Sequence, residues 1–165
     1  MSFSFVPKYS FRNLTDISSE FLGNLGIKFL MIDLDNTIAA YNEHEPSDTV
    51  LKWFEDIRKN GITPFLISNS TRTNRVEAFS KELGTGFVMK ARKPSPDGLL
   101  KAMGMASYEP AVSALIGDQI FTDTLAGNRA GVISILVQPK RFTNPFLALR
   151  YYIEAPFRIL CKNKR

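Results

Sequence analysis

Short apolar runs alternate with amphipathic stretches along most of the chain. Runs of mostly apolar residues, bounded by polar or turn-forming ones, predict buried strands over 27–32, 62–67, 87–89, 112–116 and 132–137. Between these runs, helical spacing and capping residues predict helices over 48–60, 72–83, 96–103 and 122–130. Strands separated by helices of this length imply βαβ crossovers. The pattern therefore predicts an α/β fold in which a mainly parallel sheet is covered by helices on both faces.

Two residues refine these elements. Gly104 follows the third helical stretch, and because glycine is common just past a helix end, it is predicted to stop that helix. Pro64 lies inside a predicted strand, although proline lacks the N–H group that a sheet ladder uses. The Pro64 nitrogen is therefore predicted to lie at an edge or at an irregular position of the sheet.

The composition is that of a folded domain without disulfides. The chain has 165 residues, of which 44% are hydrophobic and 22% charged, so one domain with a substantial core is expected. A single cysteine, Cys161, excludes an internal disulfide and favours a reducing compartment, the cytoplasm or an organellar matrix. With one histidine, His44, these ligand types are too few for a zinc site, so a metal would be a hard cation held by oxygen. No apolar run approaches the roughly 20 residues of a membrane-spanning helix.

Positive charge is concentrated near the end of the chain. The net charge is +5, but residues 139–165 contain seven basic residues and one acidic residue, which leaves the rest of the chain at −1. Attraction for an anionic partner therefore resides mainly in this segment. We expect a domain over 1–143, with a lead-in at 1–25, followed by a basic amphipathic tail at 144–165.

The tail has the pattern of an amphipathic helix. Asn144-Pro145 is a good helix start, and apolar residues recur at helical intervals up to Leu160. Pro156 is predicted to kink or divide this helix near Ala155. The interleaved basic residues suit a helix lying on an anionic membrane. Alternatively, the apolar face packs on the domain and the cations point to solvent.

Polar side chains that can carry chemistry follow three of the predicted strands. They are Asp33 and Asp35, Ser68 and Asn69, and Asp118. Because ligands bind beyond the carboxyl ends of the strands in open α/β sheets, these segments are expected to converge on one site. Two carboxylates crowded at a strand end repel each other, and a divalent cation would offset that repulsion. Each segment taken alone can also be interpreted as a turn or a helix cap.

Together, four segments in this order resemble the four motifs of the haloacid-dehalogenase superfamily. They are Asp33-Leu-Asp-Asn-Thr-Ile, Leu66-Ile-Ser-Asn-Ser, Ala91-Arg-Lys-Pro, and Leu115-Ile-Gly-Asp with the nearby Thr122-Asp123. The resemblance extends from about residue 26 to residue 137. It implies a three-layer α/β/α Rossmann-like fold. The intervals between the motifs leave no room for a large inserted domain, so a minimal cap or none is expected.

The resemblance also implies a role for each matching residue. Asp33 corresponds to a nucleophile that becomes phosphorylated, Asp35 to a general acid and base, and Lys93 to the cation that steadies nucleophile and phosphate. Mg²⁺ is implied as cofactor, held by Asp33, Asp118 and the main-chain carbonyl of Asp35, with Asp123 beside it. The implied substrate-binding residues are Thr37, Ser68, Asn69 and Arg92. Because superfamily dehalogenases and ion-pumping ATPases lack an acid at the second position, the implied reaction is phosphate-ester hydrolysis.

The motif details are similar to the small subclass IIIA phosphatases, which include phosphatidylglycerophosphate phosphatases. A site without a lid also favours a bulky substrate, such as a macromolecular or lipid phosphate. The resemblance thus implies conversion of phosphatidylglycerophosphate to phosphatidylglycerol in phospholipid and cardiolipin biosynthesis. Together with this substrate, the basic tail favours peripheral contact with the inner face of a membrane.

Two alternatives remain open. One is a general phosphomonoesterase acting on soluble sugar, nucleotide or protein phosphates. The other is a non-catalytic protein whose basic tail binds nucleic acid or another protein. No nucleic-acid partner is expected, because the chain lacks the aromatic-basic signature of an RNA-recognition motif. The oligomeric state is left open.

Overall fold

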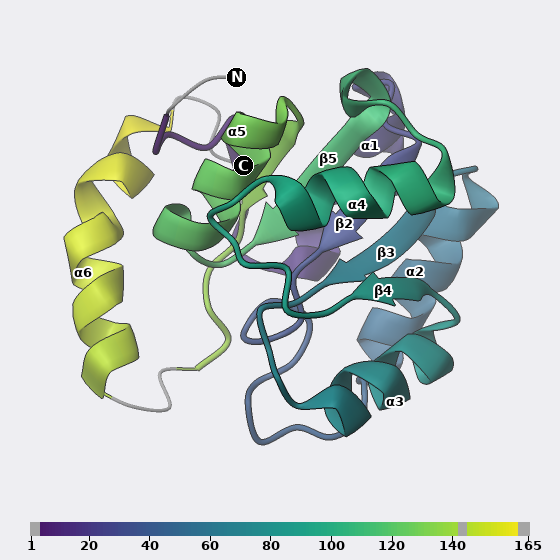
Figure 1. Cartoon of the computed structure of the whole chain (residues 1–165), viewed down its shortest axis with the longest axis horizontal. Helices are drawn as coiled ribbons and strands as arrows, with labels where there is room; N and C mark the ends of the chain where they lie inside the picture. The colour runs from purple at the N-terminus through teal and green to yellow at the C-terminus, as the bar shows by residue number, and fades with distance from the viewer. Residues whose placement is uncertain (1–3, 142–144, 162–165) are drawn as a thin grey trace.

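A six-stranded parallel sheet forms the centre of the computed structural model, which describes residues 4–141 and 145–161 (Figure 1). The strand order is β1-β6-β5-β2-β3-β4, and every neighbouring pair is parallel. The strands are β1 (Tyr9–Ser10), β2 (Phe29–Ile32), β3 (Thr63–Ile67), β4 (Gly86–Val88), β5 (Ser113–Gly117) and β6 (Ile133–Leu136). This confirms the predicted α/β fold with its three layers. The short strand β1 was not predicted.

Helices cover both faces of the sheet. They are α1 (Ser19–Asn24), α2 (Asp48–Lys59), α3 (Thr73–Leu83), α4 (Asp97–Ala106), α5 (Leu125–Ala130) and α6 (Pro145–Leu160). Side chains alternate across the sheet, so Leu30 and Ile32 of β2 pack in one core with α1, α2 and α3. Phe29 and Met31 of the same strand pack in a second core with α4 and α5. The sheet is therefore apolar on both sides.

The connections between the motifs are short. The segment from β2 to β3 contains α2, and the segment from β3 to β4 contains α3. Both segments lie wholly within the described residues, and neither contains a further domain. The expected absence of a large cap is thus confirmed.

Two details of the predicted elements differ from the structure. Gly104 does not stop α4, which continues to Ala106 and ends at Ser107 in a left-handed conformation with a φ of 58°. The left-handed backbone of Ser107 ends the helix. Gly104 keeps the helical conformation, and a Cβ atom at its position would meet no atom within 4 Å. The predicted helix at 122–130 is divided into a π-helical turn at Ile120–Thr124 followed by α5.

Pro64 lies in β3, which is an interior strand of the sheet. It is opposite Leu30 of β2, but the pairing with β4 begins one residue later, at Phe65. The preceding residue, Thr63, donates its N–H to Lys28 on the β2 side. Since successive residues of a strand point their N–H groups to opposite sides, the Pro64 nitrogen points to the side where β4 has not begun. Its position is irregular, although it is not on an edge strand.

The tail forms a helix that packs beside the π-helical turn, at the left of Figure 1. Pro156 does not divide it, because α6 continues through this residue. The ring of Phe157 lies 5.1 Å from that of Phe5 and 6.0 Å from that of Phe121. Among the described helices, α6 included, there is none with the length and hydropathy needed to cross a membrane. Asn144 and residues 162–165, which belong to the predicted tail, lie outside the described residues.

Candidate active site

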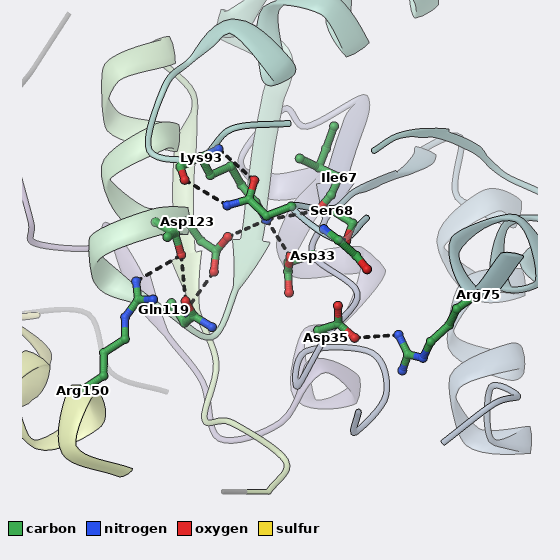
Figure 2. Close-up of polar contacts among 12 residues, drawn as sticks. Asp33, Asp35, Ile67, Ser68, Arg75, Lys93, Gln119, Asp123 and Arg150 are labelled. Carbon is green, nitrogen blue, oxygen red and sulfur yellow. Dashed lines mark hydrogen bonds and ion pairs between the residues drawn. The ribbon is translucent and has the colours of Figure 1, made fainter. Parts of the chain in front are cut away.

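A buried lysine joins two carboxylates at the carboxyl end of the sheet (Figure 2). Lys93 Nζ lies 2.6 Å from Asp33 Oδ1 and 2.7 Å from Asp123 Oδ1, and it donates to the Ile67 carbonyl at 3.0 Å. Asp33 directly follows β2, Lys93 lies between β4 and α4, and Asp123 lies in the turn after β5. The side chain of Lys93 is 1% exposed. Three distant segments of the chain therefore meet at one cation.

Asn69 holds the backbone of Lys93 in place. The side-chain amide of Asn69 donates to the Lys93 carbonyl at 2.9 Å, and its oxygen accepts from the Lys93 N–H at 2.8 Å. This pair of hydrogen bonds connects the end of β3 to the loop after β4. Asn69, an expected substrate ligand, thus uses its side chain to position the lysine.

The carboxylates of Asp33, Asp118 and Asp123 form a cluster suited to a hard cation. One oxygen of each lies within 4.8 Å of the others, and all three residues are buried. The Oδ1 atom of Asp118 is buried without a hydrogen-bond partner. Mg²⁺ prefers oxygen ligands, and three ionised carboxylates facing one ammonium leave an excess of two negative charges. The residues therefore fit a divalent cation. The carboxylate of Asp35 lies outside this cluster.

Without a bound cation, burial makes this cluster of carboxylates electrostatically unfavourable. Burial raises the pKa of Asp33 to about 7, and the charge of Lys93 opposes that rise. Burial, together with the neighbouring Asp123 and Asp33, raises the pKa of Asp118 well above its usual range. Burial lowers the pKa of Lys93, but the charges of Asp123 and Asp33 outweigh this effect and raise it. A cation placed among the acids would stabilise their ionised forms.

Asp35 forms an ion pair with an arginine that lies outside the sequence motifs. Arg75 Nη1 of α3 lies 2.6 Å from Asp35 Oδ1. The same guanidinium donates to the carbonyls of Ala40 at 2.9 Å and Glu43 at 3.3 Å. Burial raises the pKa of Asp35, and the positive charges of Arg75 and Arg72 oppose that rise. Arg75 therefore ties the second aspartate to the loop after β2.

The other expected substrate ligands lie around this cluster. Ser68 is almost fully buried, and its hydroxyl accepts from the Ser70 N–H at 3.0 Å. Thr37 is also buried, and its hydroxyl has no hydrogen-bond partner. Arg92 is exposed and has a left-handed backbone with a φ of 57°. None of these three side chains lines the pocket described next.

An open pocket of about 370 Å³ leads to Asp33, Asp35 and Lys93. Further lining residues come from four other parts of the chain: Tyr41; Asn69, Ser70, Thr71 and Arg72; Gln119, Thr122 and Asp123; and Leu147 and Arg150. The last two belong to α6, so the C-terminal helix forms part of the pocket wall. Arg150 Nε is held 3.2 Å from Glu154 Oε1, and its Nη2 lies 3.5 Å from the Thr122 hydroxyl.

A family model for haloacid dehalogenase-like hydrolases matches residues 10–131, which is most of the chain. The chain belongs to this family. The chain is similar to "Probable phosphatase YqeG" of Bacillus subtilis, which is 34% identical over 98% of this chain and 92% of its own length. "Phosphatidylglycerophosphate phosphatase 1, chloroplastic/mitochondrial" of Arabidopsis thaliana is 28% identical over 86% of this chain, but the chain spans only 43% of that protein.

The fold is also that of solved phosphatases. The structure of 3-deoxy-D-manno-octulosonate 8-phosphate phosphatase from Moraxella catarrhalis, in complex with magnesium ion and phosphate ion, superposes with a TM-score of 0.51. Its sequence is 16% identical, and the match covers 71% of this chain and 80% of that one. At this identity the likeness concerns the arrangement of strands and helices.

In this haloacid dehalogenase-like hydrolase, α6 forms part of the pocket wall, and Arg75 holds Asp35 by an ion pair. Sequence reasoning missed both contributions. Arg75 lies on a predicted helix, where an arginine is usually a solvated residue. Arg150, Glu154 and Arg158 are four residues apart, which is a common spacing for ion pairs on exposed helices. The available signal in the sequence was Glu154, the single acidic residue of the basic tail, placed four residues from an arginine on either side.

Proposed function

We propose that this protein is a magnesium-dependent phosphatase that hydrolyses phosphomonoesters through a phosphorylated Asp33. The observation that carries the proposal is the contact of Lys93 with Asp33 and Asp123, with the Asp118 carboxylate beside them. This arrangement supports Asp33 as the nucleophile, Lys93 as a fixed positive charge beside it, and the neighbouring acids as ligands of a metal ion. The phosphatase names of the relatives support the same reaction.

Repulsion between a carboxylate and a phosphate is the main obstacle to the first step. Asp33, Asp118 and the main-chain carbonyl of Asp35 would hold the Mg²⁺ ion, which supplies charge neutralisation near the transferring group. Lys93 stabilises the phosphoryl oxygens and the Asp33 carboxylate at once, because its ammonium is held between buried acids. Asp123 orients Lys93. Ser68, Thr37, Asn69 and Arg92 are proposed to position the phosphate.

Asp35 is proposed to move the proton. In the first step an Asp33 oxygen bonds to phosphorus while the ester oxygen leaves and takes a proton from Asp35. In the second step Asp35 takes a proton from water, the water oxygen bonds to phosphorus, and the Asp33–phosphorus bond breaks. Inorganic phosphate leaves, and both aspartates return to their initial state. Burial keeps the pKa of Asp35 raised, which favours the protonated form that the first step requires.

For the substrate we propose phosphatidylglycerophosphate. The Arabidopsis relative bears the name of that activity, although this chain spans less than half of it. The pocket is open, and Arg72 and Arg150 line it together with Lys93. A substrate with a second negative charge next to the scissile phosphate suits this set of cations. The phosphodiester of phosphatidylglycerophosphate provides such a charge, and a peripheral position on an anionic membrane follows from it.

The proposal is tested by phosphate release from a panel of substrates with and without Mg²⁺. Phosphatidylglycerophosphate in mixed micelles is compared with sugar, nucleotide and protein phosphates, and Asp33→Asn is the inactive control. We expect Mg²⁺-dependent release with a clear preference for the lipid. Comparable efficiency on soluble esters would support a general phosphomonoesterase instead. No release from any ester, together with salt-sensitive nucleic-acid binding, would support the non-catalytic alternative.

A further inference from the structure

Helix α6 exposes apolar side chains and buries charged ones, the reverse of an ordinary surface helix. Of the eight large apolar side chains that are exposed in the described part of the chain, six belong to α6: Phe146, Leu149, Tyr152, Ile153, Ile159 and Leu160. Each of them exposes between 54% and 72% of its surface. On a regular helix of 3.6 residues per turn, these positions fall within an arc of about 140°. We call this the outer face of α6.

Polar contacts fix this orientation of the helix. Glu154 is 1% exposed and accepts from the Phe121 N–H at 3.0 Å. It also pairs with Arg150 and, at 3.1 Å, with Arg158. Arg158 in turn donates to the main-chain carbonyl of Asp118. Rotating α6 to bury its outer face would break these bonds and leave polar groups of the site without partners. The exposed apolar strip is therefore a stable feature of the fold.

We propose that the outer face of α6 is the surface through which this protein lies on an anionic phospholipid bilayer. The role of this contact, which is to bring the enzyme to a lipid substrate, rests on the proposed function. The contact itself is inferred from the exposed apolar side chains of α6. At 16 residues α6 is too short to cross a bilayer, so it would lie in the plane of the interface with its apolar side chains inserted.

Charge favours an anionic membrane over a second copy of the chain. Glu154 is the only acidic residue among residues 145–161, and it is buried. Arg141, which precedes the helix, is exposed, and Lys162, Lys164 and Arg165 follow the helix in the sequence. Association of two outer faces would bring two positively charged segments together, whereas anionic lipids complement them.

The position of α6 connects this surface to the active site. Leu147 and Arg150, on the inner edge of the helix, line the pocket that contains Asp33. Each of them directly follows a residue of the outer face in the sequence: Leu147 follows Phe146, and Arg150 follows Leu149. A bilayer that contacts the outer face would therefore lie next to the pocket opening. A lipid headgroup could then enter while its acyl chains stay in the bilayer.

The test is flotation of the full chain with vesicles made of equal amounts of phosphatidylglycerol and phosphatidylcholine. In the test variant, Leu149→Glu and Ile153→Glu are combined. Neither residue lines the pocket, so hydrolysis of the soluble ester p-nitrophenyl phosphate should persist and report correct folding. The matched control combines Leu100→Glu and Met105→Glu, the two exposed large apolar residues of the described chain that lie outside α6.

We expect the test variant to bind the vesicles at least about tenfold more weakly, because two inserted side chains become charged. The control should bind within about twofold of the wild type. Equal binding by the test variant, or equal binding to pure phosphatidylcholine vesicles, would overturn the proposal. A dimer in light scattering that the test variant dissociates would also overturn it and assign the face to a second copy. Vesicle binding without hydrolysis of phosphatidylglycerophosphate would refute the substrate and leave the membrane surface standing.

Discussion

The guanidinium of Arg75 lies 2.6 Å from the carboxylate of Asp35 and also binds two main-chain carbonyls of the loop that follows β2. One side chain of α3 therefore orients the second aspartate and the loop 40–43 together. In the proposed reaction Asp35 carries the proton, so the position and the pKa of this carboxyl group depend on Arg75. The contact connects a residue outside the sequence motifs to the chemical step.

Arg75→Ala should lower kcat by about 10²- to 10³-fold, because the proton carrier loses its orientation. Since the positive charge of Arg75 lowers the pKa of Asp35, its removal raises that pKa further. The decline in kcat at high pH, where Asp35 loses its proton, should then move to higher pH. Arg58→Ala, at an arginine of α2 outside the pocket, is the control. An unchanged kcat and pH profile in Arg75→Ala would show that this ion pair has no part in the reaction.

Mg²⁺ should stabilise the folded protein through the acidic cluster. At a concentration of about 100 times Kd, a ligand that binds only the folded state adds about 2.7 kcal/mol. Asp118→Asn should abolish the Mg²⁺-dependent rise in Tm. Without Mg²⁺ this variant should be at least as stable as the wild type, because one of three mutually repelling buried acids is gone. Thermal unfolding with and without Mg²⁺ measures both effects.

The control for the metal experiment is Glu45→Gln, at an exposed acidic residue of the loop before α2. It should keep the full response to Mg²⁺. If Asp118→Asn retained the Mg²⁺-dependent rise in Tm, the ion would bind elsewhere, and the assignment of the cluster would be wrong.

Gly117→Ala should damage the site because β5 passes close to Asp123. A Cβ atom at position 117 would overlap the carboxyl group of Asp123, which holds Lys93. Overpacking of this kind costs about 1–3 kcal/mol of stability, and displacement of the acid should reduce kcat as well. Gly104→Ala is the matched control. It lies in a helix with open space at its Cβ position, so the substitution should stabilise the protein by about 0.5–1 kcal/mol.

Glu154→Ala should detach α6 from the π-helical turn. The substitution removes the acceptor of the Phe121 N–H and the carboxylate that pairs with Arg158, and breaking a buried ion pair costs about 3–5 kcal/mol. Urea unfolding should show this loss, whereas Glu55→Ala, which removes an exposed pair with Lys59, should change stability by less than about 0.5 kcal/mol. Equal effects of the two substitutions would mean that the α6 contacts contribute little.

The fold and the proximity of Asp33 and Asp118 were predictable from the sequence for a physical reason, whereas Lys93 and Asp123 were assigned only through the resemblance to family motifs. Buried parallel strands produce continuous apolar runs, and their carboxyl ends lie at one edge of the sheet. Asp33 and Asp118, which follow two adjacent strands, therefore had to lie close together. Strand β1 has only two residues, too few to produce a pattern of its own.

The surroundings of the cluster were less predictable because they depend on tertiary contacts. Arg75 and Asp35 are 40 residues apart in the sequence, and their contact requires α3 to pack beside the loop after β2. For α6, alternating apolar and charged residues predict two faces without indicating which one is buried. The Phe121 N–H and the Asp118 carbonyl determine the choice, since both need polar partners that only the charged face offers.

Chemical trapping of the phosphorylated enzyme would reveal directly whether Asp33 is the nucleophile. Protein quenched during turnover is treated with borohydride, which reduces an aspartyl-phosphate to homoserine, and the peptides are identified by mass spectrometry. We expect homoserine at position 33, dependent on substrate and Mg²⁺ and absent from Asp33→Asn. Homoserine at position 35 instead, or full hydrolytic activity in Asp33→Asn, would contradict the role of Asp33 as the nucleophile.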